Sequence, residues 1–135
     1  MAELLALEVA TPERELVREN VSEVQIPGKN GYFGVLPGHA PLIGEVGTGF
    51  LSYSAGNGKR YLSVQGGFVE VLPDHVRILA NTAERAEEID VERARGELKR
   101  AQEQAMIPPA VGVDPAVSLD ELAWAQARVD AAEGK

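Results

Sequence analysis

Cysteine is absent from the 135-residue sequence, and histidine occurs only twice, as His39 and His75. The missing thiols exclude disulfides, thiolate catalysis and cysteine-ligated zinc or iron–sulfur sites. Neither histidine stands in a metal-binding spacing such as H-E-x-x-H, and the serines lack the G-x-S-x-G context of an activated nucleophile. The P-loop and G-x-G-x-x-G patterns of phosphate binding are also missing. We therefore expect no catalytic residue and no metal site.

Long apolar runs and excess positive charge are missing as well. No run approaches the roughly 18 apolar residues that span a bilayer, and residues 1–9 carry acid where a signal peptide carries base. We therefore expect a cytosolic protein without direct membrane insertion. The formal net charge is −8, from 13 basic and 21 acidic residues. Nucleic acid and anionic lipid are poor partners for such a surface, because phosphate contacts need clustered lysine and arginine. A protein partner fits it better.

The feature that organises the sequence is a change of period within residues 82–94. Before this stretch, Val, Gly and Pro are frequent and apolar residues alternate; after it, Ala, Glu, Arg and Gln dominate and apolar residues recur every three to four positions. Alternation is typical of strands and the longer period of helices, so one kind of structure ends here and another begins. With 44% hydrophobic residues, the chain can form one packed domain with an appendage.

The part before this stretch predicts an antiparallel β-sandwich, with a barrel as the alternative. Short alternating runs are separated by turn residues every eight to twelve positions, without intervening helices. Gly56-Asn57-Gly58 predicts a hairpin turn, and Gln65-Gly66-Gly67 a corner or a bulge. The predicted strands are residues 5–9, 16–17, 21–26, 32–36, 50–54, 61–64, 68–72 and 76–80.

The part after it predicts a two-helix hairpin. Asp90 is a good N-cap for a helix that begins at Val91 and ends near Met106, because prolines follow. Residues 107–117 are predicted to form a linker, and Ser118 to Glu121 a capping box, S-x-x-E, that opens the second helix. The apolar seams are predicted at Val91, Ala94, Leu98, Ala101 and Ala105, and at Leu122, Ala125, Val129 and Ala132.

Alanine dominates both seams, so the hairpin buries little area and is marginally stable alone. It needs the sandwich, a partner or a ligand to hold it. Elements that move are drawn from such weakly stabilised parts of a protein. The alternative is a fixed structural hairpin.

Four segments, in order and at matching spacing, carry a resemblance. They are the runs 34–42 (GVLPGHAPL), 66–71 (GGFVEV), 76–80 (VRILA) and 83–87 (AERAE) followed by Ile89-Asp90, and the early run 9–12 (VATP) also fits. Together they resemble the epsilon subunit of bacterial F-type ATP synthase over residues 1–94. The resemblance implies a sandwich domain, residues 1–86, and a regulatory helical hairpin, residues 87–135.

The resemblance also implies a non-catalytic rotor subunit that takes part in coupling proton transport to ATP synthesis. The sandwich would dock on the gamma subunit and the rotor c-ring. The hairpin would fold down on the sandwich or extend toward the alpha and beta subunits, where it would restrain ATP hydrolysis. The protein would lie peripherally at the cytoplasmic face of the bacterial inner membrane. A free-standing, nucleotide-sensing β-sandwich protein with the hairpin as a lid is the alternative.

Some members of this family bind ATP as a regulatory ligand through a motif of the type I/L-D-x-x-R-A, and no cofactor is otherwise required. Residues 89–94 match the motif, an upstream acidic position matches, and the later of two arginines on the second helix matches, whereas Trp124 stands in place of the earlier one. Without ATP, Asp90 would cap the helix and Arg93 would pair with Glu84, Glu87 or Glu97. The implied nucleotide-binding residues are Glu84, Ile89, Asp90, Arg93, Ala94 and Arg128.

The loop from residue 28 to residue 41 is the expected surface toward the gamma subunit or the c-ring. Glycine and proline make it stiff and irregular, and a merely stiff loop is the alternative. The expected interface residues are Gly28, Tyr32, Pro37, Gly38, His39 and Pro41.

Overall fold

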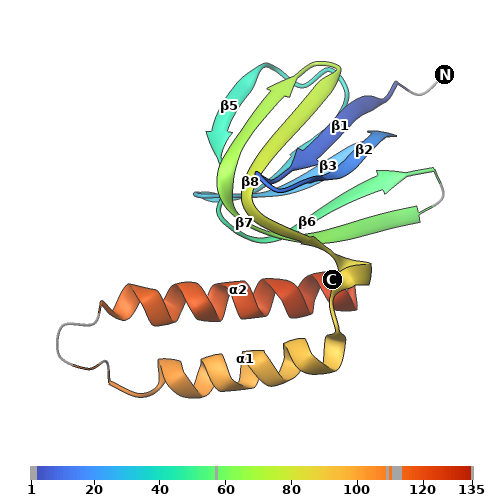
Figure 1. Cartoon of the computed structure of the whole chain (residues 1–135). Helices are drawn as coiled ribbons and strands as arrows, with labels where there is room; N and C mark the ends of the chain where they lie inside the picture. The colour runs from blue at the N-terminus through green and yellow to red at the C-terminus, as the bar shows by residue number, and fades with distance from the viewer. Residues whose placement is uncertain (1–2, 57, 109, 111–113, 135) are drawn as a thin grey trace.

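The structure is a computed structural model, and it describes residues 3–56, 58–108, 110 and 114–134. Eight strands form a β-sandwich, and a short 3₁₀ helix leads from it into two antiparallel helices (Figure 1). The elements are β1 (Leu5–Ala10), β2 (Glu15–Val21), β3 (Glu23–Gly28), β4 (Gly31–Val35), β5 (Leu42–Glu45), β6 (Thr48–Ala55), β7 (Gly58–Leu72), β8 (His75–Arg85), η1 (Ala86–Glu88), α1 (Val91–Ala105) and α2 (Pro115–Glu133).

The predicted fold class is confirmed, with one exception in strand direction. The strands follow the order β2-β1-β8-β7-β6-β3-β4, and β5 pairs with β7. The neighbours are antiparallel except β1 and β8, which run parallel, with Leu7 opposite Val76. The prediction of a wholly antiparallel sandwich is therefore wrong for this pair. The hairpin with β2 sets the direction of β1, and the pairing with β8 joins strands far apart in the sequence, where local turn signals carry no information.

Alternation along the strands builds the sandwich core. On β1, Leu5, Leu7 and Val9 point inward and are at most 1% exposed, while the residues between them are half-buried. The pattern recurs on β8, where Val76, Ile78 and Ala80 are buried. The β-branched residues suit this packed, pleated surface.

A sharp corner in β7 lets one strand serve both layers. Before the corner β7 pairs with β6, and after it β7 pairs with β5. Gln65 lies opposite Thr82 and Gly67 opposite Ala80, so the register with β8 continues without an inserted residue. The predicted feature is thus a corner and not a bulge. Gly67 has φ of 120°, and a Cβ built there would lie 2.1 Å from the carbonyl oxygen of Leu79.

The start of the first helix is confirmed and that of the second is shifted. The Asp90 carboxylate accepts a hydrogen bond from the Arg93 N–H at 3.1 Å, so Asp90 is the N-cap. The second helix begins at Pro115, where the Asp114 carboxylate accepts from the Ala116 N–H at 2.9 Å. The predicted capping box at Ser118–Glu121 is therefore wrong, because proline in the first turn and an aspartate cap start the helix earlier.

The predicted linker extends too far, because its last residues, 115–117, belong to the second helix. Residues 109 and 111–113 of the predicted linker, and Asn57 of the predicted turn, lie outside the described residues.

The second helix is buried from two sides, because α2 lies between α1 and the β6–β7 part of the sheet (Figure 1). Ala125 and Val129 of the predicted seam are buried, and so are Ala127 and Ala131, which the prediction missed. On α1, Ala94 is the buried member of the predicted seam. A hairpin seam alone needs one apolar stripe, whereas a helix covered by both a helix and a sheet needs two.

A charged clamp fixes the connector between the sandwich and the hairpin. Arg14, in the β1–β2 turn, donates from Nη1 and Nη2 to the two carboxylate oxygens of Glu88 at 2.7 and 2.8 Å. Glu88 also accepts from the backbone N–H of Arg85 at 3.0 Å. These donors hold the pKa of Glu88 down at about 2, with the Arg14 hydrogen bonds as the largest cause. The connector therefore stays on the sandwich as far as Glu88.

The corner predicts a strong effect of a single methyl group. Gly67→Ala is expected to lower the free energy of unfolding by at least about 2 kcal/mol, because the methyl group meets backbone atoms at a positive φ. Gly58→Ala is the matched control, since a Cβ there meets nothing within 4 Å, and its effect should stay within about 0.5 kcal/mol. Urea denaturation of both variants checks this. Equal stability of the two would contradict the assignment of a strained corner.

The clamp predicts a pH-dependent stability difference. The folded pKa of Glu88 lies below its ordinary 4.5, so the clamp contributes fully above about pH 4.5 and is lost as the pH falls toward 2. At pH 7, Glu88→Gln should lower the free energy of unfolding by about 1 kcal/mol, a value reduced for solvent screening. The deficit should shrink when urea unfolding is measured at pH 3. Glu13→Gln is the control, because Glu13 lies next to Arg14 in the β1–β2 turn, and it should show neither effect. A Glu88→Gln deficit unchanged by pH would argue against ionic stabilisation.

Candidate functional site

The face of the sheet beneath α2 combines aromatic rings with small polar residues. Phe50 and Tyr61 pack against the cluster formed by Ile89, Ala94, Val129 and Ala131. Strand alternation places Ser52 and Ser63 on the same face, and both are buried. Among the described residues, the Ser63 hydroxyl is buried without a hydrogen-bond partner. Small side chains on both surfaces let helix and sheet approach closely.

One arginine joins the three elements that meet at this face. Arg128 on α2 donates from Nε to Glu84 Oε1 on β8 at 2.7 Å, and from Nη1 to Glu97 on α1. Its side chain is 17% exposed, and those of Glu84 and Glu97 are each 28% exposed. Breaking one of these pairs would leave a half-buried charge without its partner, which costs more than losing a surface salt bridge.

A second arginine extends this group into a chain of four charges. Arg93 Nε lies 3.1 Å from Glu97 Oε1, so Glu97 contacts both arginines. The Arg93 side chain is 77% exposed and is open to solvent on its outer side. We call Glu84, Arg93, Glu97 and Arg128 the ionic junction. Its two positive and two negative groups sum to a formal charge of zero.

The nucleotide-site residues implied by the sequence are thus partly brought together. Glu84, Arg93 and Arg128 meet in the ionic junction through Glu97, which the implied site did not include. The signal for Glu97 is its i, i+4 spacing from Arg93, which had marked it as a pairing partner. Asp90 caps α1, whereas Ile89 and Ala94 are buried in the apolar cluster beneath the hairpin. Trp124 is half-buried, one turn before Arg128 on α2.

Four of the six expected interface residues line two separate hollows. Gly28 and Tyr32 line one of about 500 Å³ beside Glu45, and Pro37 and Gly38 line another of about 620 Å³ beside Pro73. His39 is half-buried and its Nδ1 lies 2.7 Å from the Ala40 carbonyl oxygen, next to the exposed Pro41.

Tyr32 has a structural contact besides its exposed ring. Its hydroxyl accepts a hydrogen bond from the Phe50 N–H at 3.1 Å, and the two rings lie 5.6 Å apart. Desolvation at this position is the largest cause of its raised pKa. Tyr32 therefore helps to support the face on which α2 packs.

Three large apolar side chains form an exposed surface past the corner of β7. Ile43, Phe68 and Leu79 are 77%, 61% and 53% exposed and line one hollow of about 190 Å³. Phe68 pairs with Leu79 across β7 and β8, so their side chains lie on one face. We call these three residues the apolar patch. Apolar surface gathered in this way is typical of a contact with another protein.

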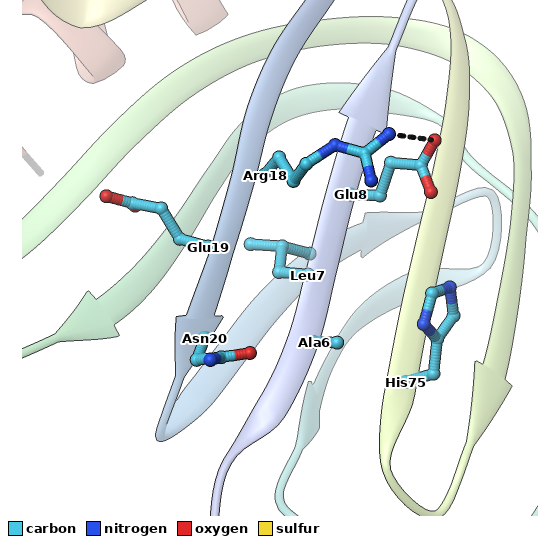
Figure 2. Close-up of a pocket in the computed structure, with 7 residues that line it drawn as sticks. All are labelled: Ala6, Leu7, Glu8, Arg18, Glu19, Asn20 and His75. Carbon is cyan, nitrogen blue, oxygen red and sulfur yellow. Dashed lines mark ion pairs between the residues drawn. The ribbon is translucent and has the colours of Figure 1, made fainter.

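A polar hollow of about 230 Å³ lies over β2, β1 and the start of β8 (Figure 2). Arg18 reaches across to Glu8 at 4.0 Å, and Glu8 also pairs with Arg77 at 3.3 Å. Arg18 also pairs with Glu15 at 2.8 Å, so the two arginines and the two glutamates neutralise one another. His75 lies on the other side of Glu8 (Figure 2). Over the described parts of the chain, no group of three or more His, Cys, Asp or Glu side chains is arranged to hold a metal ion. Nor does any helix in these parts have the length and apolar character to cross a membrane.

The sequence is similar to known proteins of one family over its whole length. The family described as "ATP synthase, Delta/Epsilon chain, beta-sandwich domain" matches residues 4–86. The ATP synthase epsilon chain of Solibacter usitatus (strain Ellin6076) is 59% identical over 135 residues, which is 100% of both chains. That of Koribacter versatilis (strain Ellin345) is 51% identical over 104 residues, 77% of this chain and 73% of the relative.

Solved structures agree with the fold. A chain in the mitochondrial ATP synthase of Euglena gracilis (OSCP/F1/c-ring, rotational state 1) aligns with a TM-score of 0.72 and 28% identity, covering 93% of this chain and 77% of the other. A chain in the central stalk and c-ring of the Tetrahymena thermophila enzyme aligns with a TM-score of 0.62 and 13% identity, which supports the fold alone. The described site contains structural ion pairs and an apolar patch, as suits a stalk component. The chain belongs to the family of ATP synthase epsilon chains.

Proposed function

We propose that this chain is a rotor subunit of the central stalk of an F-type ATP synthase and docks on the gamma subunit through the apolar patch. The observation that carries the proposal is the exposure of Ile43, Phe68 and Leu79 together, past the corner of β7. A partner that covers these side chains gains the free energy of burying them. Glu70 and Arg77 line the same hollow and would orient the partner by charge.

The other partners follow from the same assignment. The hollow at Gly28 and Tyr32 and the loop from Pro37 to Pro41 are the proposed surfaces toward the c-ring or an adjoining part of gamma. The subunit would couple proton transport to rotary ATP synthesis from a peripheral position at the cytoplasmic face of the bacterial inner membrane. Its role is to transmit and regulate rotation, and catalysis belongs to other subunits.

The hairpin is the proposed regulatory element. In the structure it is folded down on the sandwich, and we propose that an extended form reaches the alpha and beta subunits and inhibits ATP hydrolysis. The docked form is held by a small apolar cluster and by ion pairs. Ser52 and Ser63 lie on the covered face, and their hydroxyls would regain water when α2 leaves. Both features keep the free energy of release small.

ATP is the proposed regulatory ligand of the docked form. Support comes from the gathering of Glu84, Arg93 and Arg128 at one place. The exposed guanidinium group of Arg93 can contact phosphate oxygens, and that of Arg128 can do so once one of its two carboxylate partners is displaced. No cofactor is required for the structural role.

A copurification experiment tests the assignment to the stalk. The chain coexpressed with its gamma subunit should copurify with it, whereas Phe68→Glu should reduce the recovered complex at least tenfold, because it places a charge in the contact. Met106→Glu is the control, since Met106 is 86% exposed at the end of α1, away from the patch. Failure of the unsubstituted chain to copurify would contradict the assignment. Normal copurification of Phe68→Glu would exclude the apolar patch as the contact. Saturable ATP binding without gamma binding would favour a free-standing sensor.

A truncation tests the hairpin as a brake. Deleting residues 89–135 keeps Glu88, which Arg14 clamps to the sandwich, and should leave binding to gamma intact. ATP hydrolysis by the assembled complex should rise, because no hairpin can extend. Copurification with gamma serves as the control for folding of the truncated chain. Unchanged hydrolysis by a fully assembled complex would show that the hairpin is not inhibitory.

A further inference from the structure

We propose that Glu97 is a built-in anionic ligand for Arg93 and Arg128, which lets the hairpin dock on the sandwich without a bound nucleotide. The proposal rests on the proposed hairpin switch and specifies what neutralises the two arginines of the hairpin in its docked state. It also predicts how ATP, where it binds, must enter: by displacing a carboxylate of the chain itself.

The hydrogen bonds of Arg128 are already used in the docked form. Nε and Nη2 face Glu84 at 2.7 and 3.5 Å, and Nη1 donates to Glu97. A guanidinium group that is 17% exposed has little surface left for a further ligand. A phosphate approaching Arg128 would have to replace one of these two carboxylates.

Glu97 is the carboxylate that can leave. Both side chains are 28% exposed, but Glu84 lies on β8 within the sandwich, whereas Glu97 lies on α1, the outer helix of the hairpin. Its other oxygen lies 3.1 Å from Arg93 Nε, so the carboxylate bridges the two arginines. An anion placed between these arginines would occupy the position of Glu97.

Charge and tethering both favour Glu97 over a free anion. The ionic junction sums to zero, so an added triphosphate meets no excess positive charge and is repelled by both carboxylates. Glu97 lies on α1 and Arg128 on α2, so their pairing is intramolecular within the hairpin, which gives Glu97 a high effective concentration at Arg128. Trp124, one turn before Arg128, adds no positive charge to offset this. The docked state should therefore form without ATP and bind ATP weakly.

Glu97→Gln is the decisive variant, because it removes the charge with little change in shape or helix propensity. Hydrogen exchange of residues 116–133, measured by mass spectrometry on the full chain without nucleotide, reports opening of α2. The variant should lose roughly tenfold in protection there, while exchange in the sandwich core is unchanged. ATP titrated by calorimetry should bind the variant roughly tenfold more tightly than the unsubstituted chain, and ATP should restore the lost protection. Glu103→Gln, on an exposed residue near the end of α1, is the matched control and should change neither measurement.

The outcomes separate this proposal from the proposed function. Unchanged protection of α2 in Glu97→Gln would overturn it, as would lost protection without any gain in ATP affinity. Copurification of Glu97→Gln with gamma is measured in parallel and tests the stalk assignment alone. Loss of protection and tighter ATP binding, together with normal gamma binding, support both proposals. Loss of protection, tighter ATP binding and no gamma binding by either chain supports Glu97 as the internal ligand and contradicts the stalk assignment.

Discussion

The position of α2 between a sheet and a second helix is the constraint on which the rest of the structure depends. A helix in this place needs small side chains on the two sides that are covered. Alanine supplies most of the buried positions of α2, with Val129 as the larger exception. On the sheet, the small residues Ser52 and Ser63 lie beside the rings of Phe50 and Tyr61. Close approach is thereby gained at the expense of buried area, since small side chains remove little apolar surface from water.

Because the apolar contact is small, charge has a larger part in holding the hairpin than in holding the sandwich. The sandwich core consists of interdigitated Leu, Val and Ile side chains from its strands. The hairpin adds the ionic junction and the pair between Arg95 and Glu133, at 2.6 Å between the two helices. Ion pairs of this exposure are weak singly and weaken with salt, so they suit a contact that must open. The two parts of the molecule therefore differ in the kind of force that holds them.

The features that the sequence predicts correctly are those set by a few neighbouring residues, and the features that it misses are set by contacts between distant elements. The Asp90 cap, the end of α1 and the corner at Gly66–Gly67 depend on a few neighbouring residues, and the structure agrees with them. The parallel β1–β8 pair, the short strand β5 and the second buried stripe of α2 depend on distant elements, and local patterns missed them. The site divides in the same way. Spacing pointed to Glu97 as a partner of Arg93, but its contact with Arg128 depends on the packing of α1 against α2.

The clamp at Glu88 and the cluster at Ile89 show where a reversible hairpin must turn. Glu88 is bound by Arg14 of the sandwich, whereas the next residue, Ile89, is buried with Ala94 and Val129 of the helices. Adjacent residues thus belong to different packing units, and any release of the hairpin leaves Glu88 in place while Ile89 loses its neighbours. Rotation is then confined to the backbone between Glu88 and the Asp90 cap, because the cap moves with α1. A hinge of this length lets the hairpin leave while the apolar patch and its surroundings keep their shape.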